Sequence, residues 1–102
     1  MPTKITDLRK YARGKPCKVR LEGCDGGGET TVLAHYSLSG ISGRGLKSPD
    51  LIGAWCCHSC HVLIDGQAHV ANLTRDDVRL AHAEGVFRTQ YALIKEGLLG
   101  DV

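Results

Sequence analysis

Residues 57–61, with the sequence CHSCH, place metal-binding side chains at short spacing. Cys57 and Cys60 are separated by two residues, which is the spacing of a zinc knuckle. Cys17 and Cys24, with six residues between them, provide a second pair of thiols. Four thiolates would complete a tetrahedral Zn²⁺ site, so the sequence predicts a structural zinc. The alternative is a set of buried apolar thiols that bind no metal.

The chain has five cysteines, one more than such a site needs. Adjacent Cys56 and Cys57 are poor partners for each other, and Cys57 has the tighter spacing to Cys60. We therefore expect Cys56 to be the spare thiol, although it could replace Cys57. No apolar run is long enough to cross a membrane and no signal peptide begins the chain, so we expect a cytoplasmic protein. In that compartment clustered cysteines bind metal more often than they form disulfides.

Charge is distributed unevenly along the 102 residues, which carry a formal net charge of +2. Residues 1–20 contain seven basic side chains against Asp7 alone, a net charge of +6, whereas the remainder has a net charge of −4. A basic segment on an acidic body favours a polyanionic partner such as nucleic acid. The alternative is a solvated N-terminal segment with no partner.

Local patterns predict a small α+β fold. A short helix capped by Thr6 is expected to run through Arg13 and to pack through Leu8, Tyr11 and Ala12. Strands are expected at 30–36 and, less clearly because Gly53 interrupts it, at 50–56. The knuckle should turn into a short helix that reaches about residue 65.

Thr74 is expected to cap a long helix that ends at Gly97. The side chains that recur on one stripe at helical spacing should pack over the core; they are Leu80, Ala83, Phe87, Tyr91 and Ile94. We expect one domain, 1–102, with a basic N-terminal segment (1–16), a zinc-stapled core (17–66) and a C-terminal helix (74–97).

The order strand, His35, loop, strand, Cys-x-x-Cys-His and helix resembles the HNH, or His-Me finger, nucleases with a zinc-ribbon support. Residues 30–66 would cover the ββα-metal unit of that family, which is treble-clef-like. Over most of its length the chain is also similar to the YbcO-like prophage proteins. That similarity rests on Leu8-Arg9-Lys10, Ala12-Arg13-Gly14, Val32-Leu33-Ala34-His35, Pro49-Asp50-Leu51-Ile52, residues 57–61 and Arg88-Thr89-Gln90.

The HNH resemblance implies roles for individual residues. His35 would be the general base that takes a proton from water, and His61 would bind a catalytic divalent metal. Asp65 follows His61 by four residues, so both would share a helix face and could hold Mg²⁺ or Mn²⁺. His69, a short turn later, is a further candidate ligand.

The chain departs from the HNH pattern at two positions. Ala34 stands where an Asp often precedes the catalytic His, and the central Asn has no counterpart at its usual distance before the knuckle. Asp50 is the nearest polar candidate, but it comes two residues too early unless the strand bulges. His58 is expected to be an exposed spacer, and His82 a surface or packing residue.

Basic residues of the N-terminal region are the expected DNA-binding side chains: Arg9, Lys10, Arg13, Lys15 and Arg20. The glycine-rich loop 40–48 nearly matches a phosphate-binding P-loop. Leu46 separates its Gly from its Lys and no helix follows, so we expect no nucleotide cofactor. Arg44 and Lys47 of this loop could instead contact DNA phosphates; alternatively the loop is simply solvated.

These features together predict a metal-dependent DNA endonuclease of phage or prophage type, in the cytoplasm of a bacterial host and linked to recombination or DNA processing. A host or phage recombination protein is a possible partner. The alternative is a non-catalytic, zinc-stabilised module that binds DNA or acts as a recombination adaptor.

Overall fold

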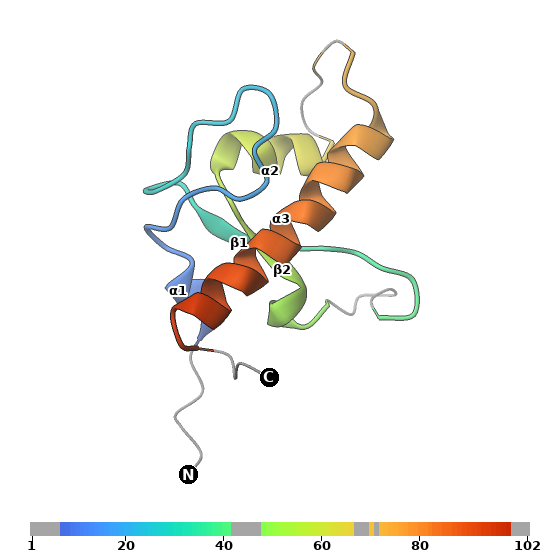
Figure 1. Cartoon of the computed structure of the whole chain (residues 1–102). Helices are drawn as coiled ribbons and strands as arrows, with labels where there is room; N and C mark the ends of the chain where they lie inside the picture. Colours follow the sequence, from blue (N-terminus) through green and yellow to red (C-terminus); the bar gives the residue numbers. More distant parts are fainter. Residues whose placement is uncertain (1–6, 42–47, 67–69, 71, 99–102) are drawn as a thin grey trace.

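The computed structural model describes residues 7–41, 48–66, 70 and 72–98. Within these residues the fold is a small α+β arrangement of three α-helices and a two-stranded sheet (Figure 1). In chain order the elements are α1 (Leu8–Tyr11), β1 (Val32–His35), the 3₁₀ turn η1 (Asp50–Ile52), β2 (Gly53–Cys56), α2 (His58–Ile64) and α3 (Arg75–Lys95). Among the described residues, no helix has the length and apolar character needed to span a bilayer.

The two strands are antiparallel, with Val32 opposite Cys56 and His35 opposite Gly53. All four residues of β2 are buried, which is expected for a strand covered by the long helix. α3 crosses in front of the sheet in Figure 1, and the Trp55 amide donates to the Thr89 hydroxyl at 2.9 Å. At the same residue the Lys18 amide donates to the Trp55 carbonyl at 2.8 Å, which attaches the cysteine-containing loop to the edge of β2 that is not paired with β1.

The short helix α1 packs as predicted but begins differently. Ala12 is fully buried beside Trp55, and Leu8 and Tyr11 pack against the same cluster. The predicted Thr6 cap is wrong, because the Asp7 carboxylate caps the helix, accepting from the Arg9 and Lys10 amides at 3.1 and 3.4 Å. Asp is at least as good an N-cap residue as Thr, so the sequence alone could not decide which of the two adjacent residues begins the helix.

The second strand begins at Gly53 and not at Asp50. Residues 50–52 form the 3₁₀ turn, so Gly53 starts the strand instead of interrupting it. A Cβ atom at Gly53 would lie 2.8 Å from Leu33 Cγ and 3.2 Å from the Asp50 carbonyl oxygen. The glycine therefore allows the turn to fold back closely against β1.

α3 has the predicted cap and length, but it turns a different face toward the core than predicted. Thr74 and Asp77 form a reciprocal capping box, with hydrogen bonds of 2.9 and 3.1 Å. The predicted packing stripe is wrong, since Leu80, Phe87 and Tyr91 are 61%, 68% and 62% exposed. The buried face consists of Val78, His82, Gly85, Val86, Thr89 and Leu93.

Close approach of α3 to the cysteine-containing loop explains this orientation. A Cβ atom on Gly85 would lie 2.9 Å from Val19 Cγ2, 3.1 Å from Val19 Cα and 3.2 Å from the Lys18 carbonyl oxygen. The contact admits only a small residue, so α3 turns Gly85 toward the loop and the large side chains of the predicted stripe, among them Leu80 and Phe87, outward. The Arg88 guanidinium donates to the same Lys18 carbonyl at 2.8 Å and fixes the position of the helix.

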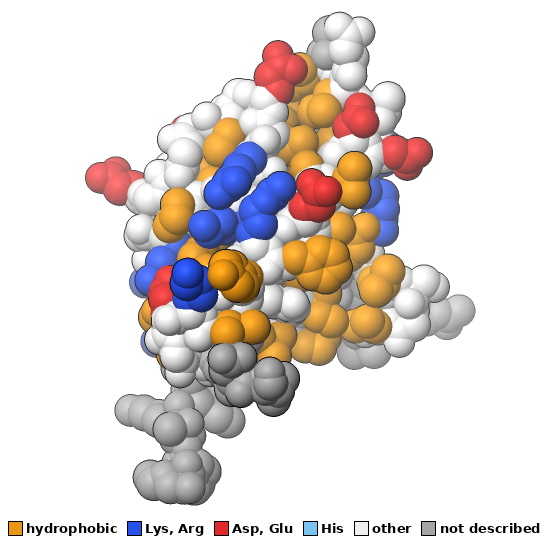
Figure 2. Space-filling view, in the orientation of Figure 1, with side chains coloured by type: hydrophobic (Ala, Val, Ile, Leu, Met, Phe, Trp, Pro, Cys, Tyr) orange, Lys and Arg blue, Asp and Glu red, His pale blue; other side chains and the backbone are white. Residues whose placement is uncertain are grey.

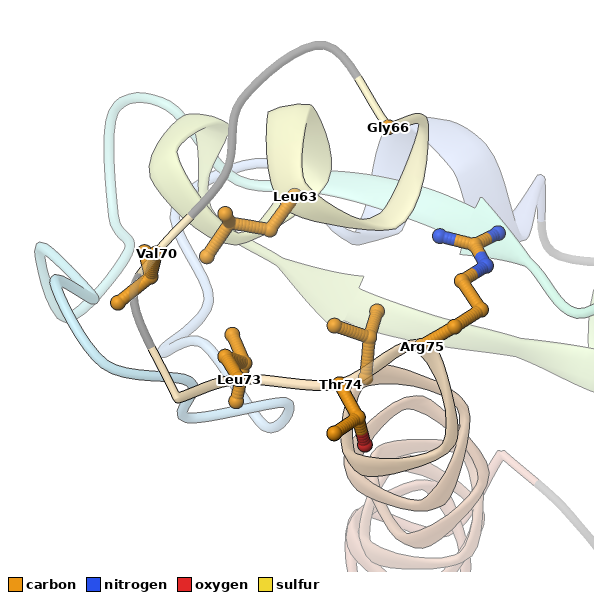
Figure 3. Close-up of a pocket in the computed structure, with 7 residues that line it drawn as sticks. Leu63, Gly66, Val70, Leu73, Thr74 and Arg75 are labelled. Atoms are coloured by element: carbon orange, nitrogen blue, oxygen red, sulfur yellow. The ribbon is translucent and has the colours of Figure 1, made fainter.

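The connection between α2 and α3 encloses an apolar hollow of about 260 Å³, lined in part by Leu63, Val70 and Leu73 (Figure 3). Arg75 extends away from those three side chains and donates to the Ile64 carbonyl at 2.9 Å. This bond ties the first turn of α3 to the C-terminal end of α2.

Gly85→Val should lower the free energy of unfolding by about 1–3 kcal/mol, because the added atoms must displace Val19 and the Lys18 backbone. Urea unfolding measures the change. Glu84→Val is the control at an exposed neighbouring position; valine is a better helix former than glycine and a poorer one than glutamate, so helix propensity alone would make Gly85→Val the more stable variant. Equal stability of the two variants would contradict the close contact.

Candidate functional site

Four cysteine sulfurs from two distant segments meet in one place. The Sγ atoms of Cys17, Cys24, Cys57 and Cys60 all lie within 4.8 Å of one another. The Cys17–Cys60 and Cys24–Cys57 sulfur pairs are 3.8 and 3.7 Å apart. A tetrahedral Zn²⁺ with bonds of about 2.3 Å places its sulfurs roughly 3.8 Å from each other. The donor set and its dimensions therefore fit a structural metal such as zinc.

Backbone amides surround these sulfurs. The Leu21 and Cys60 amides donate to the sulfurs of Cys60 and Cys57, each at 3.4 Å, and the Gly26 amide donates to Cys24 at 3.3 Å. Such N–H···S contacts stabilise negative charge on thiolate ligands and fix their orientation. Cys57 is also the N-cap of α2, so the same sulfur that completes the cluster starts the helix.

Cys56 lies outside the group of four sulfurs, which is consistent with its predicted place as the spare thiol. It is fully buried, and its sulfur lies 3.4 Å from the Cys57 carbonyl oxygen. The neighbouring Cys17 and Cys60 sulfurs, together with burial, raise the pKa of Cys56. Cys56 is therefore a neutral core residue beside the cluster.

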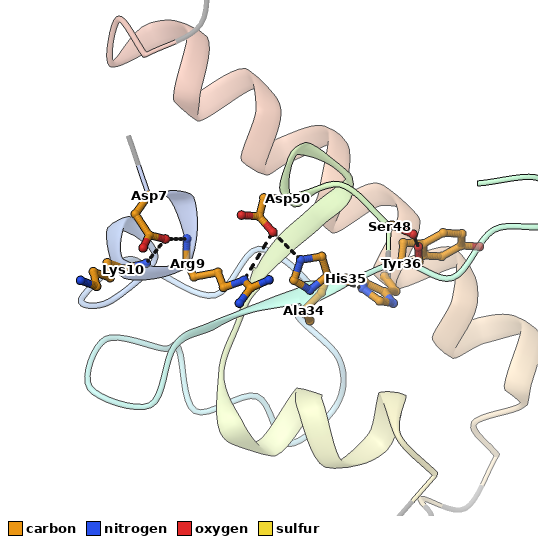
Figure 4. Close-up of polar contacts among 9 residues, drawn as sticks. Asp7, Arg9, Lys10, Ala34, His35, Tyr36, Ser48 and Asp50 are labelled. Atoms are coloured by element: carbon orange, nitrogen blue, oxygen red, sulfur yellow. Dashed lines mark hydrogen bonds and ion pairs between the residues drawn. The ribbon is translucent and has the colours of Figure 1, made fainter. Parts of the chain in front are cut away.

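His35 is held by a carboxylate from the 3₁₀ turn. Its Nε2 lies 2.7 Å from Asp50 Oδ1, and Arg9 Nε lies 3.5 Å from the same oxygen (Figure 4). The hydrogen bond to His35 and the charge of Arg9 hold the pKa of Asp50 below its usual value. Asp50 reaches His35 because η1 turns back over the end of β1, where His35 stands opposite Gly53. No strand bulge is needed.

One open groove brings four of the predicted site residues together, Arg9 with His35, His61 and Asp65. We call it the β1–α2 groove; its volume is about 580 Å³ and its lining residues are Arg9, Val32, Leu33, His35, His61 and Asp65. His61 and Asp65 face the same way on α2, with Nε2 and Oδ2 3.8 Å apart. Adjacent ligand atoms of an octahedral ion with bonds of about 2.1 Å are about 3.0 Å apart, so a small side-chain rotation that shortens this separation would let the pair share one divalent metal.

Two further hollows adjoin the β1–α2 groove by sharing its lining. Arg9 also lines a hollow of about 530 Å³ with Arg13 and Glu29. His35 and Asp65 also line a hollow of about 240 Å³ with Arg75 and Arg79. Because they share these residues, we treat the three hollows as one surface, called the trough, with Arg9 and Arg13 in the lining of one end and Arg75 and Arg79 in the lining of the other.

Residues 6–98 match the model of the protein family described as "Putative nuclease YbcO". The chain belongs to this family. It is 44% identical over 96 residues to proteins of that name from Escherichia coli (strain K12) and from Enterobacteria phage 82; each alignment covers 93% of this chain and 98% of the relative. A solved chain described as "Structure of a putative bacteriophage protein from Escherichia coli str. K-12 substr. MG1655" matches with a TM-score of 0.72 and 39% identity, covering 89% of this chain and 100% of that one.

The similarity to the YbcO family that the short sequence segments indicated is thus confirmed, whereas the HNH subtype stays a prediction. Among the described residues, the four cysteines are the only group of three or more His, Cys, Asp or Glu side chains that could hold a metal. In the β1–α2 groove this YbcO-family chain therefore offers the two donors of His61 and Asp65. His69, the other predicted ligand, lies outside the described residues, as do Arg44 and Lys47.

The remaining predicted DNA-binding residues differ in their surroundings. Lys10, Arg13 and Arg20 are exposed. Lys15 instead pairs with Glu96 at 3.0 Å and lies 4.2 Å from the centre of the Tyr11 ring. The hydrogen bond to Glu96 raises the pKa of Lys15. Its charge is thus engaged within the protein, at the junction of the N-terminal region with the end of α3.

Two arginines of α3 that line the trough were not among the residues predicted from the sequence. Arg75 and Arg79 are one helical turn apart, and Arg79 donates to the Ser37 carbonyl at 3.3 Å just beyond β1. Their spacing with His82 was visible in the sequence, but it became meaningful only once the orientation of α3 was known. His58, predicted to be an exposed spacer, is exposed at the start of α2.

His82 supports the strand that carries His35. It is buried, its Nε2 lies 2.9 Å from the Ala34 carbonyl oxygen, and its ring packs edge-on against Tyr36. Burial lowers the pKa of His82, because the charged ring would lose its hydration. Its predicted packing role is confirmed.

Stability should fall as the pH is lowered below about 6.5, the ordinary His pKa, because the unfolded chain then binds a proton that folded His82 refuses. His82→Gln keeps an N–H donor for the Ala34 carbonyl and cannot titrate in this range. Urea unfolding between about pH 5 and 7.5 should therefore show a flatter pH dependence for the variant. Thiol protonation affects both proteins alike, so parallel pH profiles would exclude His82 as the cause.

Purified protein should contain one zinc ion per chain. Cys57→Ser should lose that metal and unfold at a much lower temperature, because one corner of the tetrahedron is gone. Cys56→Ala is the matched control and should retain zinc, since its thiol lies outside the cluster. Elemental analysis and thermal denaturation make the comparison, and the reverse pattern would transfer the ligand role to Cys56.

Proposed function

We propose that this YbcO-family chain is a metal-dependent endonuclease that hydrolyses DNA phosphodiester bonds with an HNH-type ββα-metal core. The observation that carries the proposal is the β1–α2 groove, where His35, His61 and Asp65 line one open space. The family description, with its phage relative, supports a nuclease of phage or prophage type. Work in the host cytoplasm, in DNA processing or recombination, follows from the same proposal.

His35 is the proposed general base. Its Nε2–H donates to Asp50 in this assignment, which leaves Nδ1 free to accept a proton from the attacking water. Asp50 fixes the ring orientation and tautomer, and its negative charge stabilises the imidazolium that forms. Arg9, on the same carboxylate oxygen, restrains Asp50 from the other side.

His61 and Asp65 are the proposed ligands of the catalytic metal, Mg²⁺ or Mn²⁺. A bound divalent ion would supply stabilisation of the charge that develops on the phosphate and the leaving oxygen. Mg²⁺ commonly keeps several waters and takes one or two carboxylates from a protein, so a two-donor site is compatible with it. His69 remains a proposed additional ligand.

The cysteine cluster would serve this site by fixing α2. Cys57 caps the helix, Cys60 lies in its first turn, and His61 follows directly. A zinc ion joining these thiolates to Cys17 and Cys24 would hold the His61 backbone against the rest of the core. We propose residues 17–66 as this zinc-stapled core within one domain, 1–102, flanked by the basic segment 1–16 and the C-terminal helix 74–97.

DNA would lie along the trough, with Arg9 and Arg13 at one end and Arg75 and Arg79 at the other. Contacts of arginine with phosphates position a duplex without reading its sequence, so binding should be sensitive to salt and weakly selective. Exposed Lys10 and Arg20, with Arg44 and Lys47 of the glycine-rich loop, are proposed secondary contacts. We leave Lys15 out, because Glu96 already neutralises it.

A non-catalytic DNA-binding or recombination-adaptor module is the second candidate. The observation in its favour is that the described part of the β1–α2 groove offers only two metal donors, His61 and Asp65. Such a module would retain the basic trough and the structural zinc, and it would bind DNA without cutting it. A recombination protein would then be its partner.

Nicking of supercoiled plasmid in Mg²⁺ or Mn²⁺ tests the nuclease directly. His35→Ala should reduce the rate by at least about 100-fold, the usual contribution of a general base. Asp50→Asn should reduce it by roughly 10- to 100-fold, because the ring loses its charged partner. His58→Ala is the matched histidine control, lies outside the groove lining, and should cut at the wild-type rate.

Zinc content and circular dichroism of each variant must match wild type. Unchanged cleavage in His35→Ala would remove His35 from the role of base. Tight binding without cleavage in any divalent metal would favour the adaptor module.

A further inference from the structure

We propose that the outward face of α3 is a self-association surface, on which a second copy of this chain docks with its α3 antiparallel. The surface is defined by the α3 stripe, Leu80, Phe87, Tyr91 and Ile94. These side chains are 61%, 68%, 62% and 36% exposed. Figure 2 shows hydrophobic side chains on the face of α3 turned toward the viewer, with charged side chains beside them.

The α3 stripe is continuous along the helix, and a neighbouring exposed residue widens the apolar surface. Its residues follow one another at intervals of seven, four and three, which keeps them on one side of a helix for almost four turns. Leu51, 41% exposed, borders it, because Gln90 of α3 donates to the Leu51 carbonyl at 2.6 Å. Large apolar side chains gathered along one helix face mark an interaction surface more often than scattered ones do.

The charged side chains beside the α3 stripe indicate that the partner is a second copy of the chain. One flank carries Asp77 and Glu84 in its N-terminal half and Arg88 and Lys95 in its C-terminal half. Glu84 and Arg88 pair with each other within the chain at 3.4 Å, so Asp77 and Lys95 at the two ends carry the charge difference along the flank. At 100° per residue, positions 77, 84, 88 and 95 fall within about 40° of one another around the helix, so all four side chains lie on the same side of the stripe. Two copies of this flank attract each other only when their helices run in opposite directions. A second copy of the chain is therefore the complementary surface.

The register follows from the two-fold axis that a symmetric pair requires. With the axis at Phe87, the centre of the stripe, Leu80 of one copy faces Ile94 of the other. Lys95 then lies about two residues, or roughly 3 Å along the helix, from the level of Asp77 in the second copy. Antiparallel helix dipoles favour this pairing as well.

The proposed dimer leaves both β1–α2 grooves open. Arg75, Arg79 and His82, the α3 residues that line the trough, lie roughly 120° around the helix from the stripe. The inference therefore stands whether or not the groove is catalytic. Four large apolar side chains per copy suggest an interface near the lower limit of specific ones, about 1,200 Å² in total. We expect a dissociation constant of roughly 1–100 μM.

Sedimentation velocity of the zinc-loaded chain from about 5 to 500 μM tests the proposal, since dimer content depends on concentration. Wild type should shift from monomer to dimer across this range. Phe87→Glu puts two like charges at the two-fold axis and should raise the dissociation constant at least about 30-fold. Glu22→Lys, a charge change at an exposed position of the cysteine-containing loop, is the control and should dimerise normally.

Charge exchange tests the antiparallel register. Lys95→Glu and Asp77→Lys should each weaken the dimer about 5- to 10-fold, and the double variant should recover most of the loss. Circular dichroism controls for the capping role of Asp77. A monomeric wild type at every concentration, or a Phe87→Glu variant that dimerises like wild type, would overturn the proposal. Failure of the double variant to recover would overturn the antiparallel arrangement.

Discussion

The contact among four cysteine sulfurs determines how this small chain is arranged. It joins the loop that carries Cys17 and Cys24 to the N-terminus of α2, and the same loop receives α3 through Gly85 and Arg88. β2 lies between these parts and is buried throughout. A chain with one Phe and one Trp has little apolar volume for a core. The sulfur cluster therefore takes over part of the positioning that side-chain packing performs in larger proteins.

The side chains of the proposed active site are positioned from three separate elements. His35 belongs to β1, Asp50 to the 3₁₀ turn, and His61 with Asp65 to α2. Each element is fixed in a different way: β1 by pairing with β2, the turn by the glycine at its end, and α2 by its cysteine cap. The geometry of the β1–α2 groove thus depends on contacts that lie outside it.

The sequence predicted the features that rest on local spacing. The two cysteine pairs, the Thr74 cap and the shared face of His61 and Asp65 each depend on short intervals along the chain, and short intervals fix relative position in regular structure. The contact of Asp50 with His35 could not be predicted this way. Residues 50–56 were predicted as one strand, whereas residues 50–52 form the 3₁₀ turn that brings Asp50 to His35. The buried face of α3 was also missed. Hydrophobic periodicity identifies an apolar stripe, but α3 has apolar residues on more than one face. Its rotation about the helix axis is set by the close contact with the cysteine-containing loop, which admits only Gly85.

The cluster has a further consequence for the order in which the chain acquires structure. The Cys17–Cys60 contact closes a loop of 43 residues that contains β1, η1 and β2. By the loop-closure relation, a metal that cross-linked these two residues would remove about 4 kcal/mol of conformational entropy from the unfolded ensemble. A metal ion captured early by the Cys57–Cys60 knuckle would bring the distant pair into reach before the strands need to find each other. Folding would then depend on metal supply in the cell as much as on the chain itself.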